Sequence, residues 1–233
     1  MPGPDDRPPI GPARVDRVRF GWLARLIGKL MAAYVRLVAR TARVSGPPVT
    51  QEQVIFAVWH ETNLAAAVAA YRLRNDNKAI VFSTRGFRGI VMNTMLEALG
   101  SGVVTLPDEG GGTRAEAASM SRTMAQVGRS GWSLFVSCDG PFGPHRVVKP
   151  GVLIVARESG IPVLPWAISI RPAFRLTGRW DRHIVPTPFC RLRVHEGEML
   201  RVEERQRIKP LLSTLQAELD RVAVLADARM SRG

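Results

Sequence analysis

Apolar residues recur along this chain with two spacings, which predict alternating strands and helices. Short apolar runs typical of buried strands occupy residues 54–59, 79–82, 103–106, 132–136, 163–170 and 191–195. Stretches with helical spacing cover residues 63–74, 90–99, 114–128, 151–159 and 202–230. Strands that alternate with helices predict an α/β domain with a mixed, largely parallel sheet flanked by helices.

A long helical pattern precedes this domain, from Arg17 to Arg43. Its apolar residues recur mainly at steps of three and four: Phe20, Leu23, Ile27, Leu30, Tyr34, Leu37 and Val38. Basic residues follow the same rhythm and would form one stripe on a helix: Arg25, Lys29, Arg36, Arg40 and Arg43. Charges this regular exclude a spanning helix, which needs roughly 20 mostly apolar residues. We predict an amphipathic helix over residues 17–45 that lies on an anionic membrane surface; the alternative is a helix docked on the domain core.

The length of 233 residues suits one α/β domain, which we assign to residues 46–233. Residues 1–16 are proline-rich and lack the basic start and apolar centre of a secretory signal, so they are expected to form a flexible tail. The two cysteines and four histidines have no metal-ligand spacing. No metal or cofactor is therefore expected.

The formal net charge of +13 favours a polyanionic partner, either nucleic acid or the head groups of anionic lipids. The abundance of arginine also fits the codon bias of a GC-rich genome. The sequence has no zinc finger, aromatic RNA-binding motif or recognition-helix signature. We therefore expect an anionic membrane surface as partner and no nucleic acid.

Two residues directly follow predicted strands, where sites of α/β sheets gather. His60 lies between a strand and a helix, and the helix dipole would keep its imidazole neutral and able to accept a proton. Asp139 opens the turn Asp139-Gly140-Pro141-Phe142-Gly143-Pro144. Both are candidate catalytic residues, although a structural histidine and a simple bend are the alternatives.

Basic residues near these positions are candidates for binding an anionic substrate. Arg85 and Arg88 follow the strand predicted at 79–82 and could donate charge-assisted hydrogen bonds to a phosphate. Arg114 follows a glycine-rich loop at a helix start, which offers backbone N–H groups to an anion. Lys149 could neutralise a phosphate or pair with Asp139. The alternative for each arginine is a solvated or flexible loop.

The order of several motifs resembles the lysophospholipid acyltransferase superfamily. These motifs are Trp59-His60, Asp139-Gly140-Pro141 with Gly143-Pro144, Lys149-Pro150-Gly151 and Ile161-Pro162-Val163-Leu164-Pro165. The chain looks most like a bacterial branch catalogued as a domain of unknown function, which also has motifs similar to Trp180-Asp181-Arg182, Pro186-x-Pro188-Phe189 and Gly197-Glu198. The resemblance covers roughly residues 54–200.

The resemblance implies acyl transfer from acyl-CoA or acyl-carrier protein to a hydroxyl of a lysophospholipid or related lipid, with His60 as general base. It also implies a peripheral protein on the cytoplasmic face of the cell membrane. Glycerolipid members have an aspartate five residues after the histidine, where this chain has Ala65. Asp139, or less favourably Glu61, could orient His60 instead. The alternative is a catalytically inactive lipid-binding protein, and Arg88 also replaces an aspartate of the branch.

Overall fold

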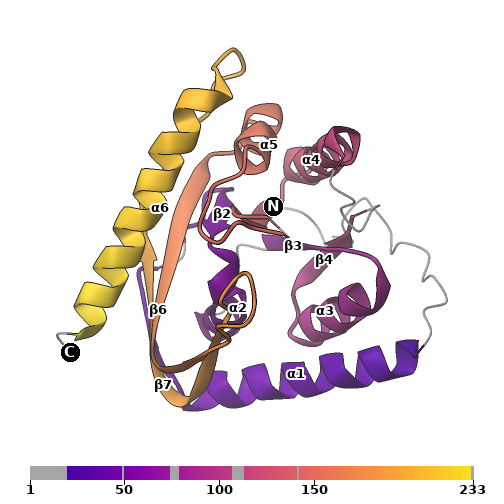
Figure 1. Ribbon diagram of the computed structural model, residues 1–233, viewed down its shortest axis with the longest axis vertical. Coiled ribbons are helices and arrows are strands. Elements are labelled where there is room, and N and C mark those ends of the chain that lie inside the picture. The colour runs from indigo at the N-terminus through magenta and orange to yellow at the C-terminus, as the bar shows by residue number, and fades with distance from the viewer. Residues whose placement is uncertain (1–19, 49, 74–78, 107–112, 141, 232–233) are drawn as a thin grey trace.

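The computed structural model describes residues 20–48, 50–73, 79–106, 113–140 and 142–231 (Figure 1). The tail predicted for residues 1–16 lies outside them. The helices are α1 (Gly21–Thr41), α2 (Asn63–Leu73), α3 (Gly86–Ala98), α4 (Arg114–Arg129), α5 (Gly151–Ser159) and α6 (Ile208–Ser231), with the 3-10 helix η1 (His60–Thr62) before α2. The strands are β1 (Arg43–Ser45), β2 (Ile55–Val58), β3 (Ala79–Ser83), β4 (Gly102–Thr105), β5 (Ser133–Ser137), β6 (Val163–Arg175) and β7 (Ile184–Glu196).

The strands described here form a seven-stranded sheet in the order β1-β7-β6-β2-β5-β3-β4. β6 and β7 are antiparallel, and the other pairs are parallel. The α/β class with a mixed, largely parallel sheet is therefore confirmed. β6 and β7 extend beyond the runs predicted at 163–170 and 191–195, because neither outer half is a continuous apolar run. Residues 171–175 of β6 are all exposed, and residues 184–190 of β7 mostly alternate between buried and half-buried.

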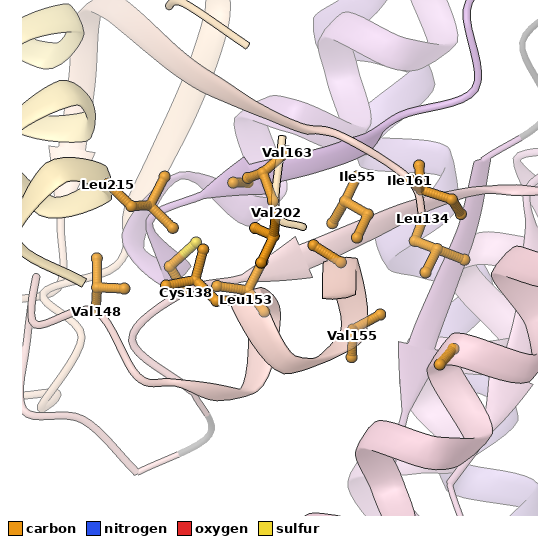
Figure 2. Close-up of a cluster of buried hydrophobic side chains, with 14 of the residues drawn as sticks. Ile55, Leu134, Cys138, Val148, Leu153, Val155, Ile161, Val163, Val202 and Leu215 are labelled. Atoms are coloured by element: carbon orange, nitrogen blue, oxygen red, sulfur yellow. The ribbon is translucent and has the colours of Figure 1, made fainter. Parts of the chain in front are cut away.

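Helices cover both faces of the sheet, and each face has its own apolar core. Side chains of β2, β5, α4, α5 and α6 form one cluster, and Figure 2 shows Ile55, Leu134, Leu153 and Leu215 among its members. α1, α2 and α3 pack on the opposite face around a second cluster. Burial on both faces explains why β2 is an uninterrupted apolar run.

α1 lies along the domain and buries a stripe of small residues: Ala24, Gly28, Ala32, Val35, Val38 and Ala39. A Cβ on Gly28 would lie 2.6 Å from the Val91 carbonyl oxygen of α3, so glycine permits this close approach. Trp22, Leu26, Leu30 and Leu37 are exposed, whereas Val38, from the same predicted apolar face, is buried. The helix ends at Thr41, and residues 43–45, predicted as helix, form β1 beside β7. Among the described helices, none is apolar and long enough to cross a membrane.

Candidate active site

Parallel strands bring the two predicted catalytic residues together at the carboxyl ends of two central strands. β2 and β5 are adjacent, and Val58 pairs with Ser137 at their carboxyl ends. His60 and Asp139 follow these ends by two residues each. The main-chain N–H of His60 donates a hydrogen bond to Asp139 Oδ1 at 3.0 Å. This edge of the sheet is the candidate active site, as the general rule for α/β sheets leads us to expect.

The His60 ring is partly accessible, with 27% of its side chain exposed. Burial lowers its pKa from the ordinary histidine value, and nearby Arg179 acts in the same direction, while Asp139 and Asp181 oppose it. Asn63 Nδ2 lies 3.5 Å from His60 Nδ1. The environment therefore favours a neutral imidazole, which is the form that can act as a general base.

Asp139 contacts the backbone around His60 and not the imidazole. Its Oδ1 accepts from the His60 amide, and its Oδ2 accepts from the Arg146 amide at 3.3 Å. The carboxyl is fully buried, and burial raises its pKa above the ordinary aspartate value against the effect of these hydrogen bonds. The structure thus gives Asp139 the task of fixing the two loops that follow β2 and β5.

Glu61, the other residue considered for orienting His60, points to a separate cluster. Its fully buried carboxylate binds His145 Nε2 at 2.9 Å, Arg175 NH1 at 2.8 Å and the Arg146 guanidinium. Burial would raise its pKa, but Arg146, His145 and Arg175 together hold the pKa below the ordinary glutamate value. Glu61 therefore ties η1 to β6 and to the loop after β5.

A carboxylate from the connection between β6 and β7 lies closest to the His60 ring. Asp181 Oδ2 is 3.7 Å from His60 Nδ1, and the Asp181 side chain is fully buried. The Trp180 ring meets the His60 ring edge-on, with centroids 5.2 Å apart. Residues 176–183, which connect β6 to β7, thus lie against the His60 ring.

The predicted substrate-binding residues occupy different parts of this edge. Arg85 is exposed at the start of α3, directly after β3, and Arg88 is exposed one turn later. The Lys149 side chain packs closely against Gly140, which has a φ of +64°. A Cβ at position 140 would lie 2.9 Å from Lys149 Cδ. Among the described ion pairs, none joins Lys149 to Asp139. Pro141, residues 107–112 and the Arg114 side chain lie outside the described residues.

A cavity of about 230 Å³ adjoins the Glu61 cluster, between η1, β6 and α6. Its wall combines apolar side chains with arginines: Trp59, Trp166, Ile168, Ile170, Ile184, Arg146, Arg171 and Arg175. His60 does not line it, whereas its chain neighbours Trp59 and Glu61 do. Within the described part of the chain, the buried Trp59 indole N–H has no acceptor. The wall of the cavity is therefore partly apolar and partly cationic.

The sequence does not reveal that Asp181 lies beside His60, nor that Glu61 binds His145, Arg146 and Arg175. Asp181 was visible only as part of the motif Trp180-Asp181-Arg182, because 121 residues separate it from His60 in the chain. No group of three or more potential metal ligands occurs within the described ranges. The residues that the structure brings together can bind anions and move a proton.

Neither a protein-family model nor a curated protein matches this sequence. Among solved structures, the fold is similar to the crystal structure of the 1-acyl-sn-glycerophosphate acyltransferase PlsC from Thermotoga maritima. The TM-score is 0.54 at 16% sequence identity, with 88% of this chain and 82% of that chain covered. The similarity establishes the fold, and it agrees with the superfamily that the motifs resemble. The bacterial branch of unknown function stays a prediction.

Proposed function

We propose that this protein is a lipid acyltransferase that acts at a membrane surface. It would move an acyl group from acyl-CoA or acyl-carrier protein to a hydroxyl of a lysophospholipid or related lipid. The observation that carries the proposal is the position of His60: a part-exposed imidazole of lowered pKa at the carboxyl edge of an acyltransferase-like sheet. No metal or cofactor is needed for this chemistry.

In the proposed reaction, His60 takes the proton of the acceptor hydroxyl while that oxygen attacks the thioester carbonyl. The new C–O bond forms, the C–S bond breaks, and the imidazolium returns the proton to the leaving thiolate. Backbone N–H groups of the turn after Asp139 are our candidates for stabilising the oxyanion. Arg85, Arg88, Arg114 and Lys149 are our candidates for binding phosphate groups of acceptor or donor.

The outward face of α1 supports a membrane-surface location. Trp22 is 65% exposed, and it begins a ridge that continues through Leu26, Leu30 and Leu37. Exposed basic side chains accompany this ridge at Arg25, Lys29 and Arg40, whereas the Arg36 guanidinium binds the Ala98 carbonyl of α3. An apolar ridge flanked by cations is complementary to an anionic lipid surface, where each basic residue adds about 1 kcal/mol.

Phe189 extends this ridge beyond the end of α1. It is 77% exposed with a left-handed φ of +63°, which is costly for a bulky residue. Its main-chain N–H donates to Thr41 Oγ1 at 3.1 Å, and Thr41 lies one helical turn after Leu37. An exposed aromatic ring held in a strained conformation beside the ridge is consistent with insertion among lipids.

The test is transfer of radiolabelled acyl groups from coenzyme A and carrier-protein donors to a panel of lysolipids. We expect product from the wild type and a 10²- to 10⁴-fold loss, on the order of a general base's contribution, in His60→Ala. His60→Gln serves as a second variant of closer size. Equal product from wild type and both variants would overturn the role of His60.

A catalytically inactive lipid-binding protein is the second candidate, and Ala65 is the observation that favours it. Ala65 is fully buried in α2, so the position of the family's orienting aspartate is apolar. Wild-type protein that binds lysolipid vesicles but transfers no acyl group from any donor would establish this second function. His60→Ala would then leave lipid affinity unchanged.

A further inference from the structure

The buried carboxylate nearest to the His60 ring belongs to a segment that lies far from His60 in the sequence. Asp181 lies in the 176–183 connection, and its Oδ2 approaches His60 Nδ1 to 3.7 Å. Ala65, at the family's position for an orienting aspartate, cannot supply a carboxylate. Asp139 and Glu61, the two acidic neighbours of His60 at the ends of β2 and β5, are engaged by main-chain amides and by the Arg146 cluster, respectively.

Asp181 is held firmly in this position. Arg179 donates two hydrogen bonds to it, from Nε to Oδ1 at 2.9 Å and from NH2 to Oδ2 at 3.0 Å. His183 Nδ1 lies 3.4 Å from Oδ2. A bidentate arginine pair fixes both the position and the plane of a carboxylate.

The surrounding loop is fixed by packing as well. Trp180 meets the edge of the His60 ring, and the turn after β5 approaches Trp180 closely at Gly143. Gly143 has a φ of +71°, and a Cβ there would lie 2.6 Å from Trp180 Cε3. A side chain at position 143 would therefore displace the residue next to Asp181.

Asp181 also keeps its charge. Burial would raise its pKa, but Arg179, His183 and His60 together hold the pKa below the ordinary aspartate value. An ionised carboxylate next to Nδ1 favours the tautomer with the proton on Nδ1, which leaves Nε2 free to accept a proton. The contact becomes a full ion pair when His60 is protonated, so it is stronger during the reaction than before it.

We propose that Asp181 is the positioning residue of His60, and that it replaces the local aspartate found in glycerolipid acyltransferases with one supplied by the β6–β7 connection. The inference rests on the proposed function for its catalytic consequence, and on the geometry for the pairing itself. Asn63 opposes the tautomer that Asp181 favours: its Nδ2, which can only donate, lies 3.5 Å from His60 Nδ1, and its Oδ1 accepts from Ser137 Oγ.

The experiment measures the titration of His60 by NMR of the labelled imidazoles, assigned with the His60→Gln variant, in the full chain. The titratable and charged groups near the His60 ring are Asp139, Asp181, Arg179 and His183. Asp181→Asn removes an attractive charge, so the His60 pKa should fall further. Arg179→Met keeps the carboxylate and removes the competing cation, so the His60 pKa should rise.

Opposite shifts in these two variants, with wild-type thermal stability in at least one of them, establish the pairing. An unchanged His60 pKa in a folded Asp181→Asn or Arg179→Met protein would overturn it. His183→Gln is the comparison variant: it removes another neighbour of Asp181 and keeps both the carboxylate and Arg179, so the His60 pKa should shift less than in the other two variants.

Acyl transfer assays of the same variants then test the consequence. Asp181→Asn should lower kcat about tenfold or more with little change in KM, and Asp181→Glu should restore part of it. A wild type without any transferase activity, but with the two opposite pKa shifts, would leave the pairing intact and show that the proposed reaction is wrong. A wild-type kcat in Asp181→Asn would overturn the positioning role.

Discussion

His60 and Asp139 are joined through the main chain of the histidine: the His60 amide donates to Asp139 Oδ1 at 3.0 Å, and the imidazole is left for other partners. The second oxygen of Asp139 accepts from the Arg146 amide. One buried carboxylate therefore determines where two loops leave the sheet. Asp139 therefore supports the site mainly by fixing the backbone of these loops.

This geometry predicts that Asp139→Ala destabilises the fold. Two backbone N–H groups would lose their buried acceptor, at a cost of about 1–3 kcal/mol each. Asp139→Asn keeps one acceptor oxygen and should cost about half as much. Urea unfolding of both variants measures the difference, and equal stability of Asp139→Ala and wild type would contradict the prediction.

The pH dependence of catalysis should reflect the lowered pKa of His60. Burial disfavours the imidazolium, so the base stays unprotonated to lower pH than an ordinary histidine. The acid limb of kcat/KM should therefore have its midpoint below about pH 6.5, the unperturbed value. The profile can be measured from pH ~4.5 to ~8.5 with one acceptor. A midpoint above the ordinary histidine value would show that attraction to Asp139 and Asp181 outweighs burial.

The ridge on α1 should determine vesicle binding without contributing to stability. Trp22→Ser combined with Leu30→Ser removes two exposed side chains, so cosedimentation with anionic vesicles should fall while the melting temperature stays within a few degrees. Val224→Ser on α6, 67% exposed in the wild type, is the matched control and should bind normally. Binding by wild type should also weaken as salt screens the basic row. Identical binding by the ridge variant and the control would exclude α1 as the docking surface.

The Glu61 cluster should make stability depend on pH. The folded pKa of Glu61 lies below its unfolded value, so its contribution is present above the unfolded pKa of about 4.3 and is lost as pH falls through the folded value. Glu61→Gln should therefore cost about 2 kcal/mol at pH ~7 and much less in acid. Glu52, in an exposed pair with Arg201, provides the control, since Glu52→Gln should cost about 0.5 kcal/mol or less. The same cost for Glu61→Gln at both pH values would contradict the linkage.

Arg85 and Arg88 should affect the binding of phosphate-bearing acceptors. Replacing both with Gln should raise KM for such an acceptor about tenfold, equivalent to about 1.4 kcal/mol, with kcat little changed. A neutral acceptor should show no difference. Arg129→Gln is the control, because Arg129 precedes β5 at the opposite edge of the sheet and binds the Glu158 carbonyl. An unchanged KM in the double variant would place the phosphate elsewhere.

The sequence by itself determined the elements and the identity of the candidate base. Each predicted strand and helix of the domain overlaps an observed one, because burial on both faces of a parallel sheet forces uninterrupted apolar runs such as residues 55–58. The position of His60 follows from the same pattern, since the residue after a buried strand reaches the carboxyl edge of the sheet.

Only the tertiary structure decided what surrounds that base. Asp181 reaches His60 because the β6–β7 hairpin is long enough to return its connection to η1. The outer halves of these strands have no continuous apolar run that would predict this hairpin. The orientation of α1 was also undecided, because small residues allow close packing on α3 while larger apolar residues face outward. Periodicity along one helix identifies an amphipathic segment, but the face that is buried depends on the shape of the neighbouring element.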